Sequence, residues 1–183
     1  YDITDSIEAY MSALVADSRT AVQLAPTPLA NAIVAKDALD RPQPVYPLDV
    51  YFCEDCAHAQ LLDVVDPAVL YRHYVYVSGT SPVFVRHFQD YAAYVTERFR
   101  ISAGGLVVEI GSNDGTLLRC FKERGMRVLG VDPAEEITRA TIAGGIDAIV
   151  GFFDLRMAKG ILADHGPAAV IAANNVIAHI DDL

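Results

Sequence analysis

The sequence has few cysteines, few basic residues and no long apolar run, and each shortage excludes a class of protein. No apolar stretch is long enough to span a bilayer, and the first residues, YDITDSIEAYMSAL, lack the basic and apolar regions of a signal peptide. The three cysteines include one close C-x-x-C pair, which argues against a secreted disulfide framework. We therefore expect a cytoplasmic protein with no membrane partner.

The charge balance excludes a further class. The chain has 14 lysines and arginines against 24 aspartates and glutamates, for a formal net charge of -10. An acidic chain gains nothing from counterion release on DNA or RNA, so no general nucleic-acid partner is expected. Hydrophobic residues make up 52% of the chain, which is the composition of a globular protein and not of a disordered one.

The first hundred residues predict a small, irregular domain and then helices. A weak helical pattern over 1–24 precedes a proline-rich stretch, 25–47, that cannot hold a long helix. VYPLDVYFCEDCAHAQLLDVV alternates like short strands around a turn at Cys53–Cys56. A short helix is expected at 67–73, then a strand and loop in YVYVSGTSP, and then a long amphipathic helix in PVFVRHFQDYAAYVTERFR.

From Leu106 the pattern changes to alternating strands and helices. Strands are expected at 106–111, 127–132, 147–152 and 168–176, with helices at 116–125, 134–145 and 155–166. This order predicts an α/β fold with a Rossmann-like, doubly wound parallel sheet. The chain stops just after the fourth strand, where such a sheet would lack its second half, so we expect it to be a fragment of a longer protein.

The sharpest motif joins the first of these strands to its helix, in VVEIGSNDGT. Gly111 allows a tight turn, and Gly115 is expected to let a ligand approach the start of the helix. Dinucleotide-binding enzymes have G-x-G-x-x-G at this turn, but two of the three glycines are replaced here, by Asn113 and Thr116. An NAD-dependent enzyme is therefore disfavoured.

S-Adenosylmethionine (SAM) suits the motif better, because it carries no phosphate but has a cationic amino group and a sulfonium. The acidic residues Glu109 and Asp114 match such a ligand, and Asn113 lies between them in the turn. The sequence therefore predicts a SAM site that includes Glu109, Gly111, Asn113 and Gly115.

Three further elements follow the next three strands. Asp132 can accept hydrogen bonds from both ribose hydroxyls, Phe152 and Asp154 can contact adenine, and Asn174 ends the fourth strand. Because the carboxyl ends of parallel strands meet at one edge, these residues are expected to complete the same cofactor site. Each also has an ordinary interpretation: Asp132 as a loop acid or helix cap, and Phe152 and Phe153 as core residues.

The chain resembles a known family at the residues just described and upstream of them. The similar stretches are EIGSNDGTLL, GVDP, NNVIAHIDDL, TPLAN at 27–31, CEDCAHAQL at 53–61 and YVYVSGTSP at 74–82. They resemble class I SAM-dependent C-methyltransferases that act on carbon 3 of nucleotide-linked 4-keto deoxysugars. The resemblance implies an N-terminal zinc-binding domain, a central methyltransferase domain, and a C-terminal domain that helps hold the sugar nucleotide and is absent here.

On this basis the chain divides into three parts: a small α+β, zinc-ribbon-like domain at 1–66, a helical connector and substrate-loop region at 67–104, and the N-terminal half of the methyltransferase domain at 105–183. The resemblance also places catalytic groups at Tyr76 and His179. It implies a further Tyr/Glu/His cluster beyond Leu183, which can hold the main base. The ordinary alternatives are that His179 caps the next helix and that Tyr76 packs between domains.

The pair Cys53 and Cys56 has the knuckle spacing of a structural zinc site, which needs four ligands. The resemblance implies a second C-x-x-C pair upstream, but the corresponding positions are Tyr10 and Ala13, so half of the expected ligand set is missing. Bound zinc and a turn with two reduced cysteines remain equal alternatives. His58 or an acid is a weak substitute ligand.

The favoured function is methyl transfer from SAM to a carbon of a nucleotide-linked keto-deoxysugar, a small-molecule partner. Two alternatives remain, because a fold and a cofactor do not fix the acceptor. One is a different small-molecule acceptor, and the other is a truncated, non-catalytic remnant that only binds the cofactor. We expect this chain alone to be inactive, and the sequence leaves an oligomer open.

Overall fold

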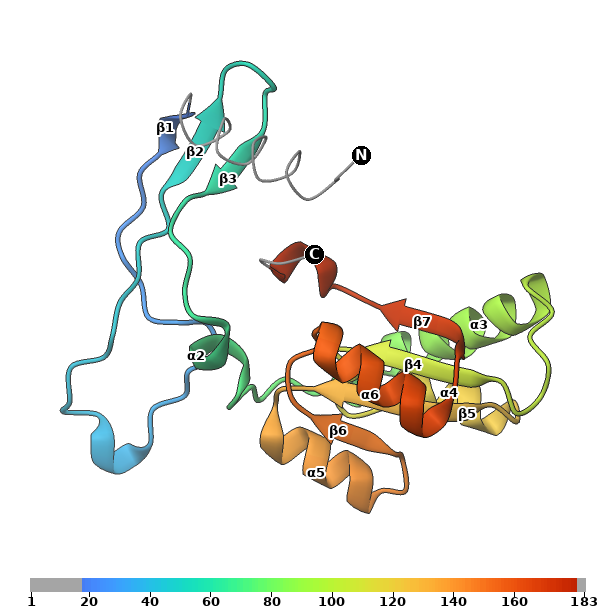
Figure 1. Ribbon diagram of the computed structural model, residues 1–183. Coiled ribbons are helices and arrows are strands. Elements are labelled where there is room, and N and C mark those ends of the chain that lie inside the picture. Colours follow the sequence, from blue (N-terminus) through green and yellow to red (C-terminus); the bar gives the residue numbers. More distant parts are fainter. Residues whose placement is uncertain (1–17, 181–183) are drawn as a thin grey trace. The chain divides into compact units, whose positions relative to one another are not determined.

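The computed structural model describes residues 18–180 (Figure 1). The chain forms two compact units, Tyr1–Leu70 and Tyr71–Leu183. The three-part division at 66 and 104 stays a prediction. Most of the helical pattern expected over 1–24 lies outside the described residues, and its described end forms a strand, β1 (Ser18–Val22), so the expectation is wrong there.

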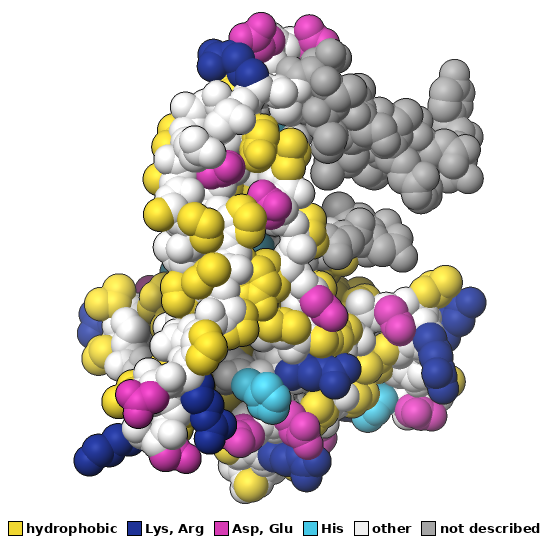
Figure 2. All heavy atoms as spheres, turned by 90° about the vertical axis from the view of Figure 1, so that its left-hand side faces the viewer, with side chains coloured by type: hydrophobic (Ala, Val, Ile, Leu, Met, Phe, Trp, Pro, Cys, Tyr) yellow, Lys and Arg dark blue, Asp and Glu magenta, His cyan; other side chains and the backbone are white. Residues whose placement is uncertain are grey.

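The first unit contains a small antiparallel sheet in the order β1-β2-β3. β2 (Val50–Cys53) and β3 (Ala59–Leu61) confirm the strands predicted around the cysteine turn. The proline-rich stretch forms only a 3-10 turn, η1 (Lys36–Ala38), and one isolated bridge between Thr27 and Tyr46. Among residues 18–70 only Cys53 is buried, and apolar side chains lie at the surface (Figure 2). These residues therefore build no hydrophobic core of their own.

The second unit begins at the end of α2 (Pro67–Tyr71). The segment YVYVSGTSP, predicted as a strand and loop, forms no strand and contains only the 3-10 turn η2 (Ser78–Thr80). α3 (Pro82–Arg98) follows, because the Ser81 hydroxyl accepts a hydrogen bond from the Phe84 N–H and Pro82 suits the first helical position.

Four parallel strands alternate with three helices in the rest of this unit (Figure 1). The elements are β4 (Leu106–Ile110), α4 (Thr116–Glu123), β5 (Arg127–Asp132), α5 (Glu135–Ala143), β6 (Ala148–Val150), α6 (Leu155–His165), β7 (Ala168–Ala173) and the 3-10 turn η3 (Ile177–His179). The strand order is β6-β5-β4-β7. The predicted α/β fold with a Rossmann-like parallel sheet is confirmed.

The sheet is covered on both faces, which explains why all five residues of β4 are buried. Val107 packs with residues of α3 and α4, including the fully buried Phe121. Its neighbours Leu106 and Val108 point to the opposite face and pack with Ile161 of α6. Two cores therefore hold the strands in a fixed register, which fixes the loops at their carboxyl ends.

Within residues 18–180, no helix combines the length and the apolar composition that crossing a membrane requires.

Candidate active site

The register of the parallel sheet brings three loops to one edge. Ile110, the last residue of β4, pairs with Val131 on one side and with Ala173 on the other. The next residues along the three strands, Gly111, Asp132 and Asn174, therefore lie level with one another at the carboxyl edge. This is the edge at which open α/β sheets bind ligands.

The glycine turn after β4 is packed against the protein itself. Gly111 has φ 68°, and a Cβ there would lie 2.4 Å from Cγ2 of Val176. A Cβ on Gly115 would lie 2.8 Å from Cγ2 of Thr141. The space that a Cβ on Gly115 would occupy is thus filled by a side chain of α5. Both glycines shape the loop, and their role in cofactor binding stays a prediction.

Glu109 is the most unusual acid of the site. It is 4% exposed, and its Oε2 atom has no hydrogen-bond partner among the described residues. Burial raises the pKa of Glu109 to about 8, a hydrogen bond with Asn174 lowers it, and the nearby Asp114 and Asp132 raise it. The carboxyl group is therefore mostly protonated at neutral pH, and a cationic ligand would favour its ionised form.

The raised pKa of Glu109 makes the stability of the protein depend on pH. The unfolded chain releases this proton near pH 4.5, whereas the folded protein keeps it until about pH 8. The free energy of unfolding should therefore fall as the pH rises between these values, by about 1.4 kcal/mol per pH unit. Glu109→Gln should remove this slope in urea denaturation, and Glu123→Gln, on the exposed side of α4, should keep it. Equal slopes in wild type and Glu109→Gln would contradict the assignment.

Asp132 at the end of β5 is buried, with 7% exposure, and both of its oxygens are engaged. Oδ2 accepts a hydrogen bond from the Asn113 N–H at 2.7 Å, and Oδ1 accepts one from the Ala134 N–H at 2.8 Å. Burial raises its pKa, and these two hydrogen bonds lower it. Each carboxylate oxygen keeps a further acceptor position, so the predicted ribose contact is compatible with this role in the turn.

The residues after β6 divide between the core and the surface. Phe153 packs against the core on the α6 face, as in its ordinary interpretation. Phe152 is 40% exposed and is the aromatic ring that a ligand can reach. Asp154 caps α6, because its Oδ1 accepts a hydrogen bond from the Met157 N–H at 2.7 Å. Contacts of Phe152 and Asp154 with adenine stay predictions.

The two predicted catalytic residues are linked by a chain of tyrosines. The ring centroids of His179 and Tyr71 are 6.4 Å apart, those of Tyr71 and Tyr74 are 6.1 Å apart, and those of Tyr74 and Tyr76 are 6.4 Å apart. Tyr76 and His179 are exposed, so both side chains can reach a ligand. Burial, followed by the effect of Tyr74, raises the pKa of Tyr71. No sequence pattern indicated Tyr71 and Tyr74 as neighbours of the two catalytic candidates.

The side chain of Asn113 does not extend freely into the site. Its Oδ1 accepts a hydrogen bond from the Ser78 N–H at 3.0 Å, and its Nδ2 donates one to the Tyr76 carbonyl at 2.9 Å. Oδ2 of Asp114 similarly accepts one from the Gly79 N–H at 2.9 Å. The predicted cofactor loop is thus bonded to the segment that carries Tyr76, a connection that the sequence interpretation missed.

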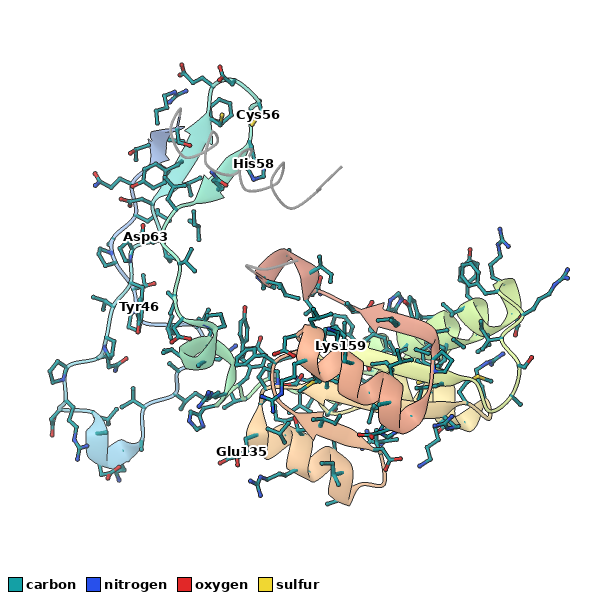
Figure 3. All side chains as sticks on the ribbon, in the orientation of Figure 1. Tyr46, Cys56, His58, Asp63, Glu135 and Lys159 are labelled. Atoms are coloured by element: carbon teal, nitrogen blue, oxygen red, sulfur yellow. The ribbon has the colours of Figure 1, made fainter. Side chains whose placement is uncertain are left out.

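Cys53 ends β2, and Cys56 lies in the tight turn between β2 and β3 (Figure 3). The Ala57 N–H donates to the Cys53 carbonyl, and the Cys53 N–H donates to the His58 carbonyl, both at 2.9 Å. Cys53 is buried and Cys56 is exposed. In the described part of the chain no three His, Cys, Asp or Glu side chains are grouped to hold a metal, and Tyr10 and Ala13 lie outside that part. The described donors alone do not complete a four-ligand zinc site.

We therefore expect purified protein to contain less than one zinc per chain, because two thiolates supply only half of a closed structural site. Elemental analysis after exhaustive dialysis measures this directly, with Cys120→Ser as the control for a cysteine in the other unit. One full equivalent of zinc that disappears in Cys53→Ser and persists in Cys120→Ser would show that further ligands complete the site.

Comparisons with known proteins match most of the chain. Residues 16–71 match the family described as "Putative zinc binding domain". C-methyltransferase NovU of Streptomyces niveus is 33% identical over 162 residues, which cover 88% of this chain and 39% of NovU. The chain therefore spans about two fifths of the length of this relative.

Similar solved structures include the plantazolicin methyltransferase BpumL in complex with SAH, with 16% identity over 57% of this chain and 41% of that one and a TM-score of 0.43. Another is magnesium protoporphyrin IX methyltransferase from Synechocystis with bound SAM, with 18% identity over 54% and 49% and a TM-score of 0.38. The zinc-binding-domain match and the identity with NovU confirm the resemblance of this chain to the SAM-dependent C-methyltransferases.

Proposed function

We propose that the protein to which this chain belongs transfers a methyl group from SAM to a carbon of a nucleotide-linked keto-deoxysugar. The observation that carries the proposal is the acidic carboxyl edge of the sheet, where an oxygen of buried Glu109 has no hydrogen-bond partner among residues 18–180 and lies close to Asp114 and Asp132. The carboxylates at this edge repel the diphosphate of a dinucleotide, whereas a ligand with an ammonium and a sulfonium group is attracted to them and favours the ionised form of Glu109. The relative NovU is named a C-methyltransferase, which supports carbon as the acceptor.

The described residues fit SAM in three places. Glu109 would face the amino group, Asp132 would accept from the ribose hydroxyls, and the exposed ring of Phe152 would pack on adenine. When bound, SAM supplies a methyl group on a positively charged sulfur, which keeps the C–S electron pair as the methyl group leaves. The protein's own tasks are then alignment and the activation of the acceptor carbon.

Activation of a carbon next to a ketone requires the loss of a proton. In the proposed reaction His179 takes this proton, and the electron pair of the broken C–H bond forms the new bond to the methyl carbon. Tyr76 donates a hydrogen bond to the oxygen on which negative charge develops. The exposure of both side chains and the tyrosine chain between them support these roles.

Calorimetric titration of the full-length protein with S-adenosylhomocysteine and with NADH tests the cofactor. We expect binding of the first and none of the second, and the reverse result would contradict the proposal. Turnover with SAM and a panel of nucleotide-linked keto sugars then tests the acceptor. Tight S-adenosylhomocysteine binding without methylation of any such sugar would point to a different acceptor.

A further inference from the structure

The segment that carries Tyr76 is held by side chains in place of a neighbouring strand. YVYV alternates like a strand but pairs with none among the described residues. The Tyr76 carbonyl and the Ser78 N–H, two residues apart, are the groups that a parallel neighbour would bind. The carboxamide of Asn113 binds both, as donor and as acceptor. The side chain therefore satisfies backbone groups that would otherwise need water or another strand.

A second contact holds the same segment one residue further along. Asp114 accepts from the Gly79 N–H through Oδ2, while its Oδ1 accepts from the N–H and the hydroxyl of Thr116 at the start of α4. A Cβ on Gly79 would lie 2.6 Å from Oδ2 of Asp114 and 2.8 Å from Oγ1 of Thr116. A side chain at position 79 would therefore collide with the side chains of Asp114 and Thr116. We call the three hydrogen bonds from Asn113 and Asp114 to residues 76–79 the loop bracket.

Asn113 also connects the loop bracket to the end of β5. Its backbone N–H donates to Asp132 at 2.7 Å, and its carbonyl accepts from the Thr141 hydroxyl at 3.3 Å. Backbone and side chain are thus both engaged, and one residue joins the predicted ribose acceptor to the Tyr76 segment. A residue bonded in this way has little freedom to shift without moving its partners.

We propose that Asn113 and Asp114 are positioning residues that fix Tyr76 relative to the bound cofactor through the loop bracket, an inference that rests on the proposed function. Asn113 then acts through Tyr76, and its side chain is not a cofactor ligand. The bracket sets the distance between the methyl group and the phenol of Tyr76. Loss of the bracket would lower turnover, because small misplacements of reacting groups cost up to about 100-fold in rate.

Two variants break the bracket from opposite sides. Asn113→Gly removes the carboxamide and keeps the positive φ of 50°, which glycine adopts without strain. Gly79→Ala leaves the cofactor loop unchanged and forces its Cβ against Asp114. The matched control is Asn31→Gly, an asparagine with φ 63° in the other unit.

The first measurement is amide hydrogen exchange at Ser78 and Gly79 in the ligand-free, full-length protein. Both amides should exchange slowly in wild type and in Asn31→Gly. In Asn113→Gly, the Ser78 amide should exchange at least about tenfold faster than in wild type. In Gly79→Ala, the amide at position 79 should exchange at least about tenfold faster than in wild type. The reason is that hydrogen-bonded amides exchange only after the hydrogen bond opens.

The second measurement separates positioning from cofactor binding. Both bracket variants should lower kcat by about 10–100-fold, and their Kd for S-adenosylhomocysteine should stay within about threefold of wild type. A parallel loss of affinity and turnover in Asn113→Gly would make Asn113 a cofactor ligand and overturn the proposal. Unchanged kcat in both variants would also overturn it.

The two proposals fail in different ways. A wild-type protein with slow exchange at Ser78 and Gly79 that does not bind S-adenosylhomocysteine would contradict the proposed function while the bracket stands. A wild-type protein that binds S-adenosylhomocysteine but exchanges both amides at the rate of an open chain would contradict the bracket while the function stands.

Discussion

His179→Asn in the full-length protein should lower kcat by about 10²–10⁴-fold and leave the affinity for S-adenosylhomocysteine nearly unchanged. Asparagine keeps a polar group of similar reach but cannot take up a proton, and loss of a general base costs a factor of this size. His179 ends η3, just beyond the carboxyl end of β7, and its side chain is exposed beside Tyr71. In the proposed reaction it therefore serves the acceptor and does not hold the cofactor.

The decisive measurement is exchange of the C3 hydrogen of the sugar with deuterated water in the absence of a methyl donor. Wild type should exchange, and His179→Asn should exchange far more slowly. His165→Asn is a suitable control, because His165 ends α6 and lies at the amino end of β7, on the opposite edge of the sheet. Equal exchange in wild type, His179→Asn and Tyr76→Phe would place the base elsewhere in the protein.

The sequence predicted the parallel sheet well because its signals there are local. β5 matches the predicted 127–132 at both ends, since a run of buried residues is bounded by Gly125 and by Asp132-Pro133. β4 and α4 are likewise separated by the glycine turn after Ile110. Strands that alternate with helices at short spacing form a parallel sheet, so the carboxyl edge followed from the order of elements.

The Tyr76 segment shows where such reasoning fails. Alternation in YVYV indicates a strand, but a strand exists only where another strand supplies partners, and the sequence does not say whether one does. Its partners are instead side chains of Asn113 and Asp114, 35 to 37 residues away. The same holds for Gly115, whose neighbours Thr141 and Ile146 come from the end of α5 and the loop that follows it. Long-range contacts of single side chains have no periodic signal.

Gly111→Val should abolish binding of S-adenosylhomocysteine. Gly111 has φ 68°, which a β-branched residue adopts only with strain, and a Cβ would lie 2.4 Å from Cγ2 of Val176. Strain and overpacking each cost about 1–3 kcal/mol, so the free energy of unfolding should fall by about 2–6 kcal/mol. Gly104→Val is the matched control, because Gly104 has φ 80° and no atom near its Cβ position. In Gly104→Val, the free energy of unfolding should fall by the cost of backbone strain alone, and S-adenosylhomocysteine should still bind.

A double-mutant cycle separates the two reasons why Gly111 is needed. Val176→Ala removes the Cγ2 atom and leaves the Val176 Cβ at 3.6 Å from the new Cβ of Gly111→Ala. In the double variant of Gly111→Ala and Val176→Ala, the free energy of unfolding should therefore be higher than the sum of the two single effects predicts, by about 1 kcal/mol or more. An additive result would show that the contact with Val176 is not what excludes a side chain. The double variant could also recover stability without recovering S-adenosylhomocysteine binding. The protein would then fold around the added methyl group and still reject the ligand, which would show that the ligand itself also occupies the space beside Gly111.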